Sequence, residues 1–350
     1  MIILKSAALL VLLSVFPACG DQLVEFAVDG GTNPGDGDTA NRPTVISTGP
    51  ANAATEVSLN KRIIATFDRA MDPATITSAS FTVRQGAAAI AGDVTYVNGT
   101  AMFVPRSLLD LSLEYVGTIT TAAADPDGNT LARNHVWTFT TGACSQAPVA
   151  LRSASRFAVL AGSTVTNTGP TSVTGDLGVS PGTSVTGFAP GILIGTQHAG
   201  DATAAQAIAD LTTAYDDAAG RTLCATSVAG NLGGQTLSPG LYRSTSSLEV
   251  TSGDLTLDAR GDSDAVFIFQ MASTLTTTSG RQVILSGGAR AANVFWQVGS
   301  SASLGTTTAF QGTIMADQAI AMSTNATLGG RALARIAVVA LDSNSVVMAD

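Results

Sequence analysis

The side chains that could perform acid–base or nucleophilic chemistry are few and widely separated in this sequence of 350 residues. Of the two histidines, His135 lies within an alternating apolar segment and His198 precedes Asp201 by three residues. A serine acting with His198 and Asp201 would form a hydrolytic triad, but no G-x-S-x-G nucleophile elbow is present to position one. The sequence therefore predicts a protein that is not an enzyme and that needs no cofactor.

Carboxylates gather with glycine in two short segments, at residues 125–129 (DPDGN) and 258–264 (DARGDSD). Calcium loops have a similar composition, but neither segment has the ligand spacing of an EF-hand. Asp and Gly are also the usual residues of turns between strands. Because the sequence has no C-x-x-C motif or histidine cluster either, we predict turns in both segments and no metal site.

Two cysteines, Cys144 and Cys224, lie outside the N-terminal segment. In an oxidising compartment they would form a disulfide. The alternative is a buried pair of free thiols, and the sequence leaves both interpretations open.

The composition limits the class of partner. Charged residues make up 12 % of the chain, well below the ~25 % of typical soluble domains. The net charge is −9, so the basic surface that nucleic-acid binding requires is missing. The 36 glycines favour many short strands joined by tight turns.

The first residues have the pattern of an export signal. Lys5 precedes an apolar run at residues 7–16, and residues 1–19 are predicted to be a signal peptide. Residues 16–19 resemble a bacterial lipoprotein cleavage box, in which Cys19 would be lipidated; the alternative is plain secretion. The predicted location is therefore outside the cytoplasm, either as an outer-membrane or cell-surface lipoprotein or as a secreted protein. A lipid at Cys19 is the only membrane contact that we predict.

A flexible linker and a first β domain are expected next. Residues 20–42 are rich in Gly, Asp, Asn and Pro without periodicity, which indicates a tether. Residues 43–142 contain short alternating segments, with hairpin signals at Asn98-Gly99 and Asp127-Gly128. An immunoglobulin-like sandwich is predicted from these strands, at residues 62–67, 80–83, 94–97, 102–104, 114–120 and 135–140.

This first domain also resembles the bacterial Ig-like domain of exported proteins, and that resemblance implies a role as a spacer. The matching residues are Val57, Asn60, Ile63, Thr66, Phe67, Met71, Asp72, Trp137 and Phe139.

The rest of the chain, residues 149–350, repeats itself. Leu304, Met322 and Leu341 end similar alternating segments, at spacings of 18 and 19 residues. A repeat of this length with strand alternation is typical of a β-solenoid, in which stacked coils share one core. The residues expected to point into that core are Leu275, Ala302, Ile320 and Val339.

One helix interrupts the β pattern of this second domain. Residues 201–219 are rich in alanine, Asp201 is a suitable N-cap and Gly220 a suitable stop. A helical stripe is formed by Ala204, Ala207, Ile208, Leu211 and Tyr215. The helix is therefore expected to pack along the side of the solenoid.

The second domain resembles the ice-binding family. The similarity is carried by residues 157–182, 214–224, 229–244, 253–277, 293–306 and 331–346. It implies a mainly β fold, a right-handed discontinuous β-solenoid with one long α-helix alongside, whose first and last segments meet near the middle of the stack.

The resemblance implies that the partner is an ice crystal surface, bound by a flat Thr/Ser/Ala face so that ice growth or recrystallisation is inhibited. We expect a monomer. The alternative function is a non-catalytic structural or adhesive protein of the cell surface. The residues predicted to form the ice-binding face are Thr164, Thr166, Thr274, Thr276, Ser301, Ser303, Ala319, Ala321, Val338 and Ala340.

The predicted face departs from the threonine-rich runs of the family. Residues 318–321 read QAIA and residues 336–340 read IAVVA, which makes the face more apolar and argues against high thermal-hysteresis activity. Ser172, Thr174, Ser184 and Thr186 also alternate, but the sequence does not say which face they occupy.

Overall fold

A computed structural model describes residues 41–349. The predicted signal peptide, Cys19 and residues 20–40 of the predicted linker lie outside the described residues. The last two linker residues, Asn41 and Arg42, contact the first domain: the Asn41 carbonyl accepts a hydrogen bond from Arg69, and Arg42 donates to the Thr130 carbonyl.

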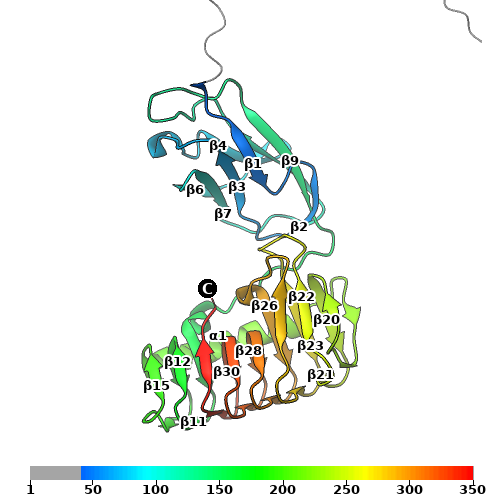
Figure 1. Ribbon diagram of the computed structural model, residues 1–350. Helices are drawn as coiled ribbons and strands as arrows, with labels where there is room; N and C mark the ends of the chain where they lie inside the picture. Colours follow the sequence, from blue (N-terminus) through cyan, green and yellow to red (C-terminus); the bar gives the residue numbers. More distant parts are fainter. Residues whose placement is uncertain (1–40, 350) are drawn as a thin grey trace, which may run out of the picture. The chain divides into compact units, whose positions relative to one another are not determined.

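The first domain is a sandwich of two sheets (Figure 1). Each predicted strand is found, within two residues at either end. The strands of one sheet, in order, are β1 (Val45–Gly49), β3 (Ile63–Phe67), β7 (Thr100–Pro105) and β6 (Gly92–Val97). Those of the other are β2 (Ala54–Val57), β9 (His135–Thr141), β8 (Glu114–Ile119), β4 (Phe81–Gln85) and β5 (Ala88–Ala89).

Alternation along these strands fills the core of the sandwich. Residues 63, 65 and 67 of β3 are buried, while the two between them are half-buried. Phe81 of β4 packs against Trp137 of the same sheet and against Phe103 of β7 in the other sheet. The predicted hairpin turn joins β6 to β7: Asn98 has φ 49° and Gly99 has φ 79°, the left-handed pair that a tight type I′ turn requires.

The second domain is a stack of parallel strands in coils (Figure 1). An eight-stranded sheet, which we call the narrow sheet, forms one of its sides. Its strands, in order, are β14 (Ser184–Thr186), β11 (Thr164–Thr168), β31 (Val339–Asp342), β29 (Ile320–Met322), β27 (Ala302–Leu304), β24 (Leu275–Thr277), β21 (Leu248–Val250) and β18 (Gly230–Asn231).

The other sides belong to a twelve-stranded sheet and a three-stranded sheet. The main path of the larger sheet is β15 (Ile192–Ile194), β12 (Ser172–Thr174), β32 (Ser345–Val347), β30 (Thr327–Ala334), β28 (Ala309–Ala316), β26 (Val294–Val298), β23 (Phe267–Met271), β20 (Gly240–Ser244) and β17 (Thr226–Ser227). It also includes β10 (Phe157–Ala161), β13 (Asp176–Val179) and β16 (Gln197–Ala199). The smaller sheet is β19 (Thr236–Leu237), β22 (Leu255–Asp258) and β25 (Val283–Ser286).

The coils are discontinuous in sequence, as predicted. β11 pairs with β31 and β10 pairs with β30, so the first segment of the domain stacks on the last. The junction differs from expectation in one respect: in the narrow sheet it lies two strands from the end of the stack rather than near its middle.

One core runs through the coils. Tyr242, Phe269 and Trp296 are paired in register on adjacent strands, and their rings stack on one another. The ring centroids are 5.2 Å apart for Tyr242 and Phe269 and 4.0 Å apart for Phe269 and Trp296. The buried Trp296 indole donates to the Gln311 carbonyl at 2.9 Å, so this large ring leaves no buried donor unpaired. Neighbouring coils thus share apolar area that a single coil could not bury.

Helix α1 (Ala202–Gly220) covers the outer side of one part of the larger sheet, which includes β10, β23 and β26. The Asp201 carboxylate accepts a hydrogen bond from the Ala204 amide at 2.8 Å, which confirms the predicted N-cap. The predicted stripe faces the sheet and packs, with Ala214 and Ala218, on a buried layer that includes Phe157, Leu160, Ile268, Phe295, Met315 and Leu333. The part of the sheet beneath the helix is therefore closed to solvent.

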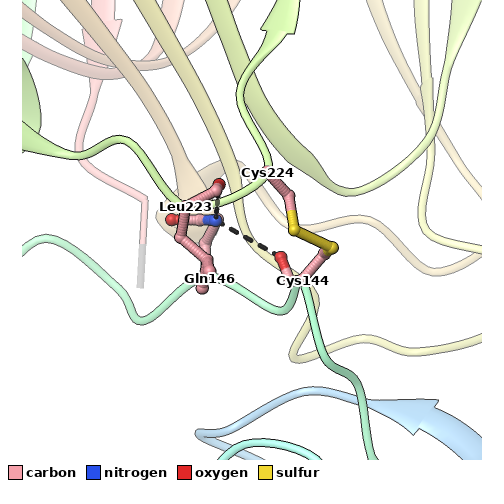
Figure 2. Close-up of a disulfide and its surroundings, with 4 residues drawn as sticks. All are labelled: Cys144, Gln146, Leu223 and Cys224. Atoms are coloured by element: carbon pink, nitrogen blue, oxygen red, sulfur yellow. Dashed lines mark hydrogen bonds between the residues drawn. A yellow bond between two sulfur atoms is a disulfide. The ribbon is translucent and has the colours of Figure 1, made fainter.

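Cys144 and Cys224 form a disulfide, so the disulfide interpretation is confirmed (Figure 2). It ties the segment that precedes the solenoid to the segment that follows α1. The Gln146 side-chain amide donates to the carbonyls of Cys144 and Leu223, at 3.3 and 3.1 Å, and so holds both chain segments beside the disulfide (Figure 2).

Candidate functional site

The outer surface of the narrow sheet carries short side chains in register. In each strand the residues with large side chains point inward, and Leu275, Ala302, Ile320 and Val339 are at most 1 % exposed, as predicted. The residues that alternate with them point outward. Each coil has two such outward positions, two residues apart. Across the sheet, the first positions of successive coils form one column and the second positions form another.

The second column is defined by strand register. Its members are Asn231, Glu249, Thr276, Ser303, Ala321, Ala340, Thr166 and Thr186. Because parallel strands lie ~4.7–4.9 Å apart, these side chains repeat at nearly that interval.

The first column lies two residues earlier in each coil. Its members are Ser247, Thr274, Ser301, Ala319, Val338, Thr164 and Ser184. The pairing continues through it, since the amides of Leu275, Ala302 and Ile320 donate to the carbonyls of Ser301, Ala319 and Val338. All ten residues of the predicted face therefore stand in these two columns.

Sequence reasoning left part of the columns unassigned. Ser184 and Thr186 of β14 continue them at one end, beside Thr164 and Thr166. Ser247 extends the first column at the other end, where its hydroxyl lies 2.9 Å from that of Thr274. The signal was the same alternation, but the sequence could not show which coils are neighbours.

Ser172 and Thr174 belong to a different face, since β12 pairs with β15 and β32. That face is also uncharged along β12, β15 and β32, but it is uneven. Ile192 and Ile194 project from it at about 60 % exposure, and Val347 is 48 % exposed. Beyond β28, the strand pairing beneath this face consists of a single bridge, between Gln282 and Ala309. The narrow sheet, whose columns carry one charged residue in Glu249, is thus the more regular of the two surfaces.

The potential catalytic groups are engaged elsewhere. His198 lies between two carboxylates: its Nδ1 is 2.7 Å from Asp201 and its Nε2 is 4.0 Å from Asp176. His135 packs against the ring of Trp137, and burial lowers its pKa. None of the hydrogen bonds of the described residues joins a serine to either histidine.

The two acidic segments form protein contacts. Asp125 accepts hydrogen bonds from the amides of Asp127 and Asn129, as in an ordinary turn. Asp262 accepts from Ser58 and Lys61, and Asp264 from Arg62. Burial acts to raise the pKa of Asp262, but the hydrogen bond and charge of Lys61 and the Ser58 hydroxyl hold that pKa below its usual value.

Within residues 41–349 no three His, Cys, Asp or Glu side chains gather in a way that could hold a metal ion. No helix in the same range is long and apolar enough to cross a bilayer.

Parallel coils, one helix packed on a side and an in-register face of mostly short, uncharged side chains are the features of an ice-binding type of solenoid. Residues 159–347 match the family described as ice-binding-like, which is more than half of the chain. The chain therefore belongs to that family, and its residues 39–141 match the bacterial Ig-like domain.

Similar proteins cover the second domain. An ice-binding protein of Nostoc sp. (strain HG1) is 49 % identical over 197 residues, which are 56 % of this chain and 72 % of that protein. One from Flavobacterium frigoris (strain PS1) is 37 % identical over 212 residues, covering 56 % of this chain and 74 % of the relative. The crystal structure of an ice-binding protein from an Antarctic biological consortium is 59 % identical, with a TM-score of 0.58, covering 59 % of this chain and 93 % of that one.

Proposed function

We propose that this protein adsorbs to ice through the two columns of the narrow sheet and so inhibits ice growth or recrystallisation. The observation that carries the proposal is the register itself: Thr166, Ala340, Ala321, Ser303 and Thr276 follow one another on adjacent strands with no charged side chain between them. Membership of the ice-binding-like family favours this function over the structural or adhesive alternative.

The physical basis is the hydration of such a surface. Hydroxyl and methyl groups at regular spacing hold water without the strong shells that surround ions, so the adsorbed layer can adopt an ice-like order. Each contact is weak. A stiff sheet makes many of them at once and loses little conformational entropy on binding.

The middle of the columns is apolar, because β29 and β31, together with the residue that precedes each strand, contribute Ala319, Ala321, Val338 and Ala340. Hydroxyl groups flank this strip on both sides. We expect adsorption and recrystallisation inhibition from such a face, with a smaller thermal hysteresis than from one with threonine throughout.

The protein is proposed to act outside the cytoplasm as a single chain. Residues 1–19 would direct export, with Cys19 as a lipid anchor or as part of a cleaved leader. The Ig-like domain and the linker would then act as spacers, and no enzymatic activity is proposed.

The test is a bulky substitution in the second column. Ser303→Tyr and Thr276→Tyr should abolish ice shaping, because a ring standing above the columns prevents close approach. The matched control is Thr327→Tyr: Thr327 is exposed too, but it lies on β30, on the other uncharged face. Circular dichroism checks that each variant is folded.

Normal ice shaping by both column variants would reject this face. If Thr327→Tyr alone abolished ice shaping, the ice-binding surface would be the face that includes β30 and not the narrow sheet.

A further inference from the structure

One charged side chain stands within the two columns. Glu249 of β21 is opposite Thr276 on one side and Asn231 on the other. From Thr276 to Thr186 the second column is uncharged over six strands, β24, β27, β29, β31, β11 and β14. Glu249 therefore divides the narrow sheet into a long neutral part and a short end made of β21 and β18.

Residue Glu249 is half-buried, and its carboxylate has no hydrogen bond or ion pair with another described residue. Asp342, another carboxylate on the narrow sheet, lies at the end of β31, just beyond the second column. Its two carboxylate oxygens accept hydrogen bonds from the hydroxyls of Thr324 and Ser343. Protein groups thus satisfy Asp342, whereas water must satisfy Glu249.

A carboxylate solvated by water organises that water around its own charge. Removing such a group from water without a partner is costly, and nothing in an ice surface compensates for it as a cation would. The shell of Glu249 therefore interrupts the ordered layer at β21, even though the backbone register continues into β18.

We propose that Glu249 marks the boundary of the ice-contacting array, which then covers the six strands from β24 to β14. This inference rests on the proposed function, since it specifies how much of the same face touches ice. It assigns Glu249 a limiting role: neutralising it should extend the contact by one strand.

The experiment compares Glu249→Thr and Glu249→Gln with the unmodified protein at equal molar concentration. Glu249→Thr should enlarge the thermal-hysteresis gap, because a seventh strand would add roughly one-sixth to the contact area of six strands. Glu249→Gln should give a gain in the same direction. Glu249→Lys should give none, because an ammonium group is also strongly hydrated.

The control for net charge is Glu114→Gln. Glu114 is an exposed carboxylate on β8 of the sandwich, so its loss changes the net charge equally without touching the narrow sheet. It should leave the gap unchanged. Melting temperatures of all variants are measured alongside, because threonine in a strand can alter stability by itself.

Ser303→Tyr is run in the same series to separate the two claims. If it lowers activity while Glu249→Thr and Glu249→Gln match the unmodified protein, the boundary is wrong and the face stands. If Ser303→Tyr has no effect, the face is wrong and the boundary is rejected with it. A gain from Glu249→Lys or Glu114→Gln equal to that from Glu249→Thr would likewise overturn the assignment.

Discussion

Val165 of β11 lies directly opposite Val339 of β31 in the narrow sheet. The two residues come from the first and last strands of that sheet in sequence order, and both are fully buried. Their pairing brings Thr166 beside Ala340 on the outer surface. The hydroxyl groups of β11 and β14 thereby join the columns, which would otherwise end at the apolar strip of β29 and β31.

This junction should be important for stability. Val339→Ala removes buried apolar surface where two distant segments meet, and we expect the free energy of unfolding to fall by about 2 kcal/mol. Val347→Ala is the control, because Val347 is in the same last coil but is 48 % exposed; its effect should stay within ~0.5 kcal/mol. Urea unfolding measures both, and equal losses would contradict the assignment of the core.

The disulfide should stabilise the folded chain. Cys144 and Cys224 are 80 residues apart in sequence, and in the loop-entropy model a cross-link over that length raises the free energy of the unfolded chain by about 4.5 kcal/mol. The double variant Cys144→Ser/Cys224→Ser should therefore unfold at a lower temperature. A reducing agent should lower the melting temperature of the unmodified protein and leave that of the double variant unchanged. The same response from both proteins would show that the disulfide does not contribute to stability.

Acid should weaken the start of α1. The hydrogen bond from the Ala204 amide, followed by that from His198, lowers the pKa of Asp201 below its usual value. A carboxyl whose pKa is lower in the folded state contributes stability above its unfolded-state pKa of ~3.9, and that contribution is lost as the pH falls through the folded-state value.

Asp201→Asn separates titration from capping, because asparagine is also a good N-cap but does not ionise. At neutral pH the variant should be less stable than the unmodified protein, because an uncharged asparagine interacts more weakly with His198 than the Asp201 carboxylate does. Its stability should depend less steeply on pH between about 5 and 2. Identical pH profiles of melting temperature would show that Asp201 does not contribute.

Hydroxyl groups in the apolar strip should increase activity. Ala321 and Ala340 are neighbours in the second column, between Ser303 and Thr166. Replacing both with threonine would continue the hydroxyl row, and threonine suits a half-exposed strand position. We expect a larger thermal-hysteresis gap at the same concentration. The control, Thr327→Ala on β30, should leave the thermal-hysteresis gap unchanged. A double variant no more active than the unmodified protein would show that methyl groups are sufficient for activity at these two positions.

Local patterns were enough to predict most of the elements. The strands of the sandwich, the helix with its Asp201 cap and the inward residues Ile320 and Val339 follow from alternation, helical spacing and capping chemistry, which act over a few residues. The same alternation placed outward side chains such as Ser303 and Ala321. Their shared role in binding ice remains a prediction.

Which coils stack beside one another depends on packing over the whole domain. Residue types alone could not place Ser184 and Thr186 beside the predicted face and Ser172 and Thr174 on another, because a solenoid coil has equivalent alternation on each side. Nor could they show that Glu249 interrupts the row, or choose between a disulfide and free thiols for Cys144 and Cys224. The sequence by itself determined which residues point in or out. Only the tertiary structure decided which outward residues are neighbours, because that depends on the order in which coils distant along the chain stack to share one core.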